Sequence, residues 1–267
     1  MSPIVFAVLV QATPPATPPA TPPAPRPAPT RELRIERLQW SRATDGPEPI
    51  SAIEIRNDFG DIRARLAGDR NLEASMIVQR LDPGPQGVGF TVERRGHAIA
   101  LVVGYPPGRV KDADPRPPKD GYDRMDLTVF VPPGVTLRAH TLRGLVEARG
   151  LQGDVEAATL DGSILVSATG VLQARTTSGE ITATLAPGAV AAPGPPHLFQ
   201  SVSGPVNLIL PAVGSAELRV DTAGGVTSKF DLRRAAEGGR TTAKAMLGAG
   251  ARLVLVHSDT GAVRIDR

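Results

Sequence analysis

The chain has 267 residues, of which 41% are hydrophobic and only 3% aromatic, and its formal net charge is +3. It contains no cysteine, which excludes disulfide bonds, thiol catalysis and a cysteine-attached lipid anchor. Basic and acidic residues are balanced in both halves of the chain, so neither half offers a basic face, and we expect no nucleic-acid partner.

The first 30 residues bear on location. An apolar run from Ile4 to Val10, followed by small residues, is typical of a secretory signal, so residues 1–12 are a candidate signal peptide. Seven apolar residues are too few to span a bilayer, and a disordered apolar tail is the alternative interpretation. Residues 13–30 repeat Thr-Pro-Pro-Ala and predict a Pro-rich disordered linker. We therefore expect an extracytoplasmic protein, in the periplasm or at the cell surface.

Residues 31–131 predict an N-terminal β region without a strict repeat. Apolar runs or alternations bounded by glycine and proline predict strands at 32–38, 50–55, 72–79, 90–93, 98–103 and 125–131. A hairpin turn is predicted at Arg95-Gly96-His97. The stretch from Gly104 to Arg124 is rich in proline and charge and predicts a long loop, either functional or a mobile insertion.

Residues 132–267 carry the most informative pattern and are predicted to form a repeat-bearing β-solenoid region. A six-residue cassette recurs there: a small polar residue, two variable positions, glycine, one variable position and a β-branched residue. One further copy lies upstream. The glycines of the seven copies are Gly60, Gly144, Gly162, Gly179, Gly204, Gly224 and Gly261. Self-similarity at this spacing indicates a stacked architecture whose units bury their apolar faces against their neighbours.

Strand geometry explains the spacing within each cassette. The residues two and four positions after the glycine are almost all apolar, whereas the residue between them is mostly polar, which predicts alternate inward and outward side chains. Glycine allows neighbouring coils to approach closely, and the preceding polar side chains can bond to the turn backbone. Intermediate glycines, with Val155 and Leu172 after them, indicate two strands per turn. We therefore predict an all-β fold, a β-solenoid or β-helix-like stack of short strands, with a two-sheet β-sandwich as the alternative.

Two features interrupt this pattern near the C-terminal end. The spacing of 37 residues between Gly224 and Gly261 is long for a regular coil. The best helix-period pattern of the chain lies between them, at 233–247, but its Gly238-Gly239 pair predicts a loop or a short helix.

These features together resemble a known family. Three features follow one another along the chain: an amphipathic strand pair ending in Gly60–Arg63, the strand Met125–Pro132, and serial Thr-x-x-Gly-x-Val cassettes with Leu208–Pro211 between them. As an ordered set, they resemble the bacterial "putative adhesin" family of unknown function. The resemblance covers most of 33–267. It implies a β-solenoid-like envelope protein, and it implies no catalytic or binding residue.

The residues themselves predict no catalytic, cofactor-binding or metal site. The four histidines, His97, His140, His197 and His257, lack metal-ligand spacing. No serine lies in a nucleophile-elbow sequence, and no glycine loop with a lysine is suited to phosphate. The residue after each cassette glycine varies, so the repeated aspartates of a calcium-binding roll are missing from this sequence.

Three function classes follow. The favoured interpretation is a non-catalytic interaction or structural domain of the cell envelope, whose partner is an unknown envelope protein or surface polymer, with self-association through strand edges as a further expectation. An extracytoplasmic regulatory or sensory domain is the alternative. The third class is a polysaccharide lyase or hydrolase, because Glu147, Asp154, Glu156 and Glu180 lie near one another in repeat phase and paired carboxylates can act on a glycan. The scarcity of aromatic residues for sugar stacking disfavours it.

Overall fold

A computed structural model describes residues 34–44, 49–80, 87–105, 124–191, 193–250 and 252–267. All of them belong to one compact unit, Glu32–Arg267. The candidate signal peptide, the Pro-rich linker and nearly all of the loop expected between Gly104 and Arg124 lie outside the described residues. Within the described ranges, no helix is long and apolar enough to cross a membrane.

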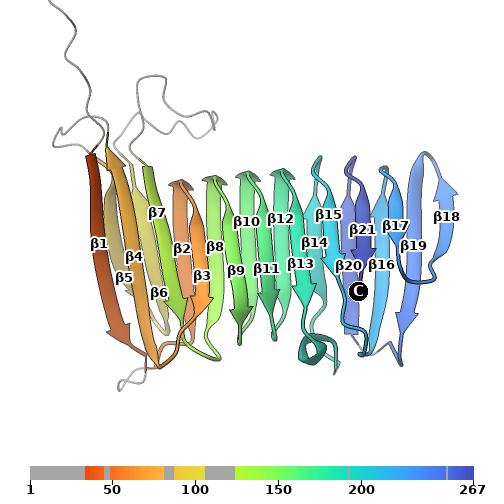
Figure 1. Cartoon of the computed structure of the whole chain (residues 1–267), viewed down its shortest axis with the longest axis horizontal. Helices are drawn as coiled ribbons and strands as arrows, with labels where there is room; N and C mark the ends of the chain where they lie inside the picture. Colours follow the sequence, from red (N-terminus) through yellow and green to blue (C-terminus); the bar gives the residue numbers. More distant parts are fainter. Residues whose placement is uncertain (1–33, 45–48, 81–86, 106–123, 192, 251) are drawn as a thin grey trace, which may run out of the picture. The chain divides into compact units, whose positions relative to one another are not determined.

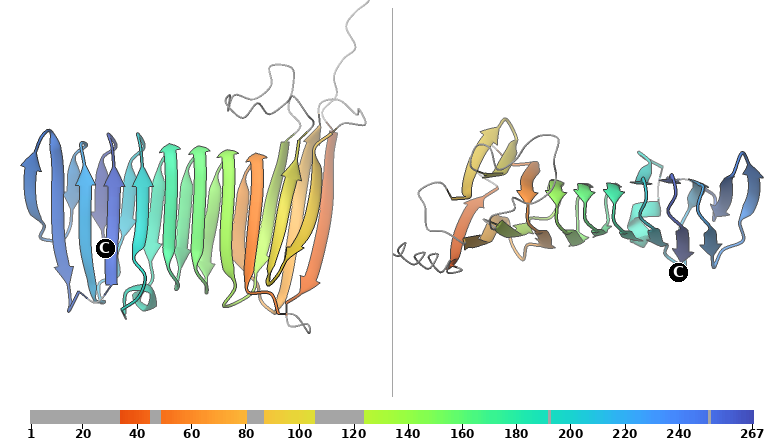
Figure 2. Two further views of the ribbon diagram at one scale, coloured as in Figure 1. Left: turned by 180° about the vertical axis from the view of Figure 1, so that it is seen from behind. Right: turned by 90° about the horizontal axis from the view of Figure 1, so that it is seen from above.

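Two large β-sheets lie face to face and enclose the core (Figures 1 and 2). Sheet A has the strand order β1-β4-β7-β3-β9-β11-β13-β15-β21-β17, and sheet B has the order β18-β19-β16-β20-β14-β12-β10-β8-β2-β6-β5. The strands are β1 (Arg34–Ala43), β2 (Ala52–Phe59), β3 (Ile62–Leu66), β4 (Asn71–Arg80), β5 (Gly89–Arg95), β6 (Ala98–Gly104), β7 (Arg124–Val131), β8 (Thr136–Arg143), β9 (Val146–Leu151), β10 (Val155–Asp161), β11 (Ile164–Ala168), β12 (Leu172–Ser178), β13 (Ile181–Leu185), β14 (His197–Ser201), β15 (Val206–Ile209), β16 (Ala216–Thr222), β17 (Val226–Ser228), β18 (Arg233–Glu237), β19 (Arg240–Leu247), β20 (Arg252–Ser258) and β21 (Val263–Asp266). A 3-10 turn, η1, covers Pro187–Val190.

The all-β prediction is confirmed, and the two large sheets correspond to the two-sheet alternative that the sequence left open. Each strand predicted in the N-terminal β region has a counterpart in the structure, although the boundaries differ by several residues. The shortest prediction, 90–93, corresponds to the longer β5. The predicted turn at Gly96 joins β5 to β6, and the positive φ of 62° at that position suits a glycine.

From β8 to β15 the chain passes alternately through sheet B and sheet A, so that each pair of successive strands forms one rung. Equivalent strands of successive rungs pair in parallel. The residues two positions after the cassette glycines therefore form one buried column, in the order Ile62, Val146, Ile164, Ile181, Val206, Val263 and Val226. The predicted inward direction of these side chains is confirmed.

The cassette glycines stack directly on one another. A Cβ atom added at Gly162 would lie 2.0 Å from the carbonyl oxygen of Gly144, and one at Gly179 would lie 2.0 Å from that of Gly162. The same close approach is repeated along the whole column, which comprises Gly60, Gly144, Gly162, Gly179, Gly204, Gly261 and Gly224. No side chain fits between the rungs there, so glycine is required by contact rather than by backbone flexibility alone.

In most cassettes a hydroxyl side chain before the glycine hydrogen-bonds to the backbone of this glycine column. Thr176 Oγ1 donates a hydrogen bond to the carbonyl of Gly162 at 3.2 Å, and Thr222 Oγ1 donates to that of Gly261 at 2.8 Å. The sequence pattern placed Asp221 in this role, three residues before Gly224. That assignment is wrong, because Thr222 is the residue paired with Ser258 of the adjacent rung and Asp221 points to the outer face.

The last rung does not follow the chain order. β20 lies between β14 and β16, and β21 lies between β15 and β17 (Figure 1). The segment 233–247 forms the antiparallel strands β18 and β19. The loop or short helix predicted there is wrong, because Gly238 and Gly239, with φ of 58° and 78°, form a two-residue hairpin turn. This hairpin accounts for the long spacing between the last two cassettes.

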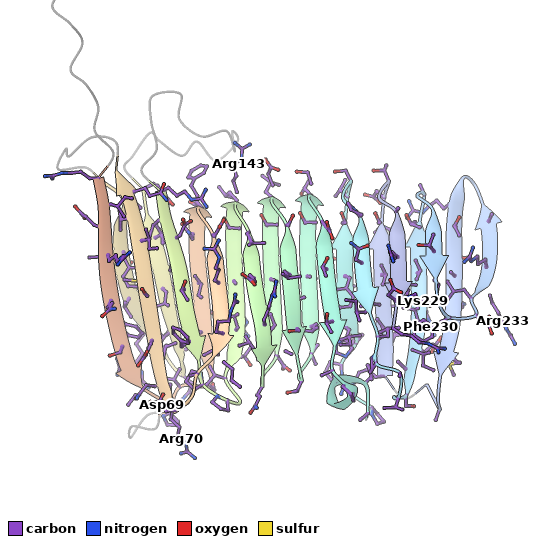
Figure 3. The ribbon with its side chains drawn as sticks, viewed as in Figure 1. Asp69, Arg70, Arg143, Lys229, Phe230 and Arg233 are labelled. Carbon is purple, nitrogen blue, oxygen red and sulfur yellow. The ribbon has the colours of Figure 1, made fainter. Side chains whose placement is uncertain are left out.

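Charged contacts fix the end of β21. Lys229 Nζ lies 2.6 Å from Asp266 Oδ1, and the hydrogen bond from this lysine holds the pKa of Asp266 below its usual range. The guanidinium carbon of Arg267 lies 4.8 Å from the ring centroid of Phe230. Figure 3 labels Phe230 beside Lys229. Arg267 and Phe230 also line a small cavity, together with Val190 of the 3-10 turn.

Candidate functional site

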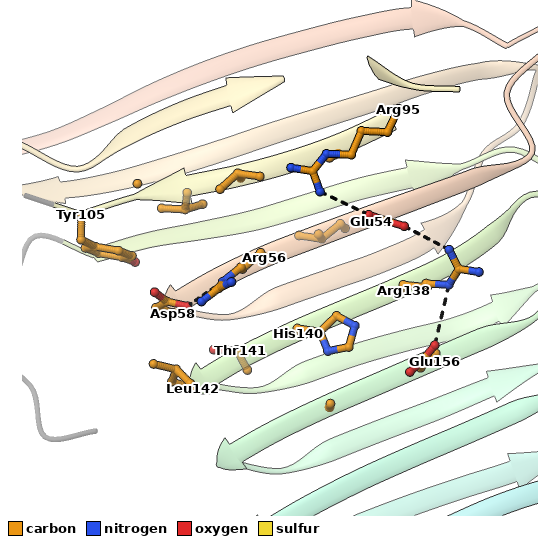
Figure 4. A pocket seen from close by; sticks show the side chains of 16 residues that line it. Glu54, Arg56, Asp58, Arg95, Tyr105, Arg138, His140, Thr141, Leu142 and Glu156 are labelled. Carbon is orange, nitrogen blue, oxygen red and sulfur yellow. Dashed lines mark hydrogen bonds and ion pairs between the residues drawn. The ribbon is translucent and has the colours of Figure 1, made fainter. Parts of the chain in front are cut away.

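An open groove lies on the outer face of sheet B. It has a volume of about 820 Å³ and crosses β2, β6, β8 and β10 (Figure 4). Its charged side chains are Glu54, Arg56, Asp58, Arg95, Arg138 and Glu156. We refer to it as the sheet B groove.

The parallel register sets the charged groups of the groove in rows. Glu54 of β2 pairs with Arg138 of β8, which pairs with Glu156 of β10. Two residues further along the same strands, Arg56 pairs with His140. Because alternate residues of a strand share a face, both rows lie on the outer surface of the sheet.

Ion pairs link the first row into a chain. Arg138 Nη1 lies 3.0 Å from Glu54 Oε1, and Arg138 Nε lies 3.7 Å from Glu156 Oε2. Arg95 Nη1, from the end of β5, lies 3.7 Å from Glu54 Oε2. The side chains of these four residues are 34 to 57% exposed, so each pair contributes only about 0–1 kcal/mol to stability and can exchange partners easily.

Tyr105 closes one end of the groove. Its hydroxyl lies 2.8 Å from Asn57 Oδ1, contacts the carbonyl of Phe59 and accepts a hydrogen bond from the Phe59 N–H at 3.2 Å. Its ring packs edge-on against Phe59, with centroids 5.3 Å apart. Burial raises the pKa of the Tyr105 hydroxyl well above its usual value, so this group stays protonated and anchors the end of β2 rather than acting as a base.

A second charged cluster lies on the outer face of sheet A, around Glu147. Its carboxylate is 2.7 Å from Arg149 Nε, 2.9 Å from Arg65 Nη2 and 3.7 Å from Arg63 Nε. The sequence predicts that Glu147 points to solvent. It does lie on the outer face, but the three guanidinium groups leave its side chain only 10% exposed. This carboxylate is fully engaged in holding β3 to β9.

A third cluster lies on sheet B at β16 and β20. His257 Nδ1 is 3.3 Å from Asp221 Oδ2, and its Nε2 is 3.0 Å from Asp259 Oδ1. Arg240 Nε lies 2.9 Å from Asp221 Oδ1, and this hydrogen bond lowers the pKa of Asp221. The adjacent Ser258 is fully buried on the inner face, so the serine offers no nucleophile to this histidine.

The other two histidines are engaged by backbone groups. His197 is fully buried; its Nδ1 accepts a hydrogen bond from the Leu172 N–H at 3.0 Å, and its Nε2 lies 2.9 Å from the Ala189 carbonyl. Burial lowers the pKa of His197. His97 Nδ1 lies 3.1 Å from the carbonyl of Pro49. Across the described ranges, no three His, Asp or Glu side chains are grouped so as to hold a metal ion.

The four carboxylates that repeat phase predicted to be close together are not brought together. Glu147 lies on sheet A and Glu156 on sheet B. Asp154 Oδ1 accepts a hydrogen bond from the Val171 N–H at 2.8 Å, and Glu180 accepts one from Asn207 Nδ2 at 2.6 Å. The prediction fails because successive strands alternate between the sheets, so a step of nine residues moves a side chain to the opposite face of the molecule.

Sequence reasoning did not single out the groove. Its main row combines β2 with β8, and Glu54 and Arg138 are 84 residues apart in the chain. The sequence feature that could have indicated the groove is the alternation, in β2 and β8, of charged residues that point outward with apolar residues that point into the core.

No family model matches the chain, and no curated protein matches it in sequence. Among solved structures, the chain is similar to a "putative cell adhesion protein" from Clostridium sporogenes ATCC 15579, with a TM-score of 0.48 and 10% identity over 87% of this chain and 99% of that one. It is also similar to "putative adhesins" from Bacteroides fragilis NCTC 9343 (TM-score 0.34, 11% identity, 86% and 96% covered) and Parabacteroides distasonis ATCC 8503 (0.28, 9%, 87% and 97%). No residue's role is transferred from these proteins.

Proposed function

We propose that this chain is a non-catalytic, adhesin-like interaction domain of the cell envelope, and that it binds an acidic surface polysaccharide through the sheet B groove. The observation that carries the proposal is the ion-paired row formed by Arg95, Glu54, Arg138 and Glu156. Neighbouring strands of a sheet are about 4.8 Å apart. Glu54, Arg138 and Glu156 lie in register on three neighbouring strands and therefore present charged groups at regular intervals, and Arg95 reaches Glu54 from β5, beyond β6. This arrangement suits an extended polymer with a repeating charge.

The weakness of these ion pairs favours ligand exchange. Arg138 is 44% exposed and Arg95 is 57% exposed, so a carboxylate of the polymer can replace a glutamate with little change in solvation. A guanidinium group binds a carboxylate through two parallel hydrogen bonds, which makes arginine well suited to sugar acids. Glu54 and Glu156 can then accept hydrogen bonds from sugar hydroxyls.

The arrangement of the carboxylates favours binding over hydrolysis. A glycosidase places two carboxyl groups across the scissile bond. In the groove, Arg138 lies between Glu54 and Glu156 and is paired with both of them. The extracytoplasmic location remains part of the proposal, and its support is the signal-like apolar run at residues 4–10.

The test is binding of the full chain to immobilised polygalacturonate, with immobilised dextran as the uncharged reference. The wild type should bind the acidic polymer and not dextran. The double variant R95Q/R138Q should lose at least tenfold in affinity. R149Q/R264Q, which removes the same charge from the outer face of sheet A, should bind like the wild type.

Two results would contradict the proposal. Equal losses in both double variants would show that only the net charge matters. Release of new reducing ends or unsaturated sugars from the polymer would show that the chain is an enzyme.

A further inference from the structure

The edge of sheet A at β1 has the features of a pairing surface. β1 is ten residues long and pairs with β4 on one side, and no other strand of the described residues pairs with it. It lies at the end of the sheet (Figure 1). Ile35 is 61% exposed and Leu38 is 40% exposed. A long edge with exposed apolar side chains readily adds another strand.

The side chains of β1 are sorted onto two faces by its register with β4. Leu38 pairs with Met76 and Trp40 with Ala74, both of which are buried, so these β1 residues lie on the inner face. Glu36 and Arg42 share that face, because alternate residues of a strand point the same way. The outer face of β1 carries Ile35, Arg37, Gln39 and Ser41.

Symmetry limits how two copies of β1 can pair. An antiparallel pair related by a two-fold axis perpendicular to the sheet keeps inner faces together. The axis must then pass midway between the two copies of one residue, which lie opposite each other, and residues equally distant on either side of this central residue pair with each other. Each choice of central residue defines one register.

The register centred on Gln39 is complementary on the inner face. It pairs Leu38 with Trp40 of the second copy and Glu36 with Arg42 of the second copy, and each pair occurs twice. Opposite charges placed directly across two strands are stabilising, and so are aromatic and aliphatic pairs. The registers on either side lack this match.

A register centred on Leu38 places Arg34 opposite Arg42, and one centred on Trp40 places Leu38 opposite Arg42. The first sets like charges against each other, and the second sets an apolar side chain against a cation. The inner-face charges of β1 therefore favour the register centred on Gln39 over both neighbouring registers.

We propose that β1 is a self-association site, at which two copies of this chain pair antiparallel about Gln39 and join their A sheets into one. This inference is independent of the polysaccharide proposal, because the sheet B groove and β1 share no residue. Its partner is a second copy of the same chain, chosen by the charge complementarity of Glu36 with Arg42.

A cysteine placed on the axis tests the register directly, since the natural chain contains none. Paired Cα atoms in an antiparallel ladder are about 4.5 or 5.5 Å apart, within the range of a disulfide. The Q39C variant should form a disulfide-linked dimer in a glutathione redox buffer. The R37C variant places its cysteine on the same face of β1. In the proposed register, residue 37 lies opposite residue 41 of the second copy, so the two cysteines would be displaced by four residues, roughly 14 Å, along the strand direction and should remain reduced.

Charge reversal tests the same register without cysteine. The full wild-type chain should show a mass of two chains in light scattering after size exclusion, and the single variants E36R and R42E should each shift it to one chain. The double variant E36R/R42E should restore the dimer. A wild type that stays monomeric, equal cross-linking of Q39C and R37C, or a double variant that remains monomeric would each overturn the proposal.

Discussion

Replacing Gly162 by alanine tests the most regular feature of the fold, the stacked glycine column. The added Cβ would lie 2.0 Å from the carbonyl oxygen of Gly144, where ordinary contacts are well above 3 Å. The two rungs must therefore separate locally by about 1 Å. No positive φ occurs at Gly162, so steric contact alone causes the effect.

The loss of stability in this variant can be estimated from the hydrogen bonds between the two rungs. Two backbone hydrogen bonds join the Gly144 and Gly162 rungs here: the Gly144 N–H donates to the Asp161 carbonyl at 3.3 Å, and the Val146 N–H donates to the Ser163 carbonyl at 3.0 Å. Stretching both by about 1 Å removes about 1 kcal/mol each, and overpacking adds about 1–3 kcal/mol. The lower entropy of the unfolded alanine chain offsets about 0.4–1 kcal/mol. We expect a net destabilisation of roughly 2–5 kcal/mol.

Urea denaturation followed by circular dichroism measures this loss as a lower midpoint at unchanged slope. The matched control is Gly68→Ala. Gly68 is exposed, has no positive φ, and a Cβ there meets no atom within 4 Å, so this variant should stay within about 0.5 kcal/mol of the wild type. If G162A and G68A unfold at the same urea concentration, the close stacking of the glycines is refuted.

Three further variants test the buried polar groups. T222V should lose about 2–3 kcal/mol in urea denaturation, because the Thr222 hydroxyl joins the Gly261 carbonyl and the Gly224 N–H, both at 2.8 Å; an unchanged midpoint would exclude this role. Burial lowers the pKa of His197, so below its unfolded value of about 6.5 the unfolded chain binds a proton that the folded chain does not, and stability should fall as the pH falls through that value. The H197Q variant should show a flatter profile of urea midpoint between pH 8 and pH 5, and a profile parallel to the wild type would contradict this assignment. E147Q should cost roughly 1–3 kcal/mol, because three guanidinium groups lose their carboxylate, whereas E156Q, 41% exposed, should cost under about 0.5 kcal/mol; equal losses would refute the distinction between these two sites.

The column of β-branched residues was predictable because its causes are local. Strand alternation has a fixed period of two, and glycine has no substitute where backbones touch, so Ile164 and Gly162 could be placed correctly without a structure. Glu147 shows the limit of this reasoning. Its outward direction follows from alternation, but its burial depends on arginines of β3 as well as on its own strand.

The order of the last strands and the sheet B groove were not predictable for a different reason. Parallel pairing joins residues far apart in the chain. Neither the apolar pattern nor the glycine spacing predicts the order in which the rungs are stacked. The hairpin at 233–247 was mistaken because its strands, of which β18 is fully exposed, carry alanine and arginine, which favour helices. Only the pairing of β19 with β16 overrides that preference.

The insertion of β20 and β21 between earlier strands has a consequence for how the chain reaches its native state. β16 and β17 are synthesised before the strands that join them to β14 and β15, so until then they have no rung to pair with on that side. The rungs cannot simply be added one after another as the chain emerges. The native strand order is completed only when β20 pairs with both β14 and β16 and β21 pairs with both β15 and β17, so the C-terminal segment joins the two parts of the stack.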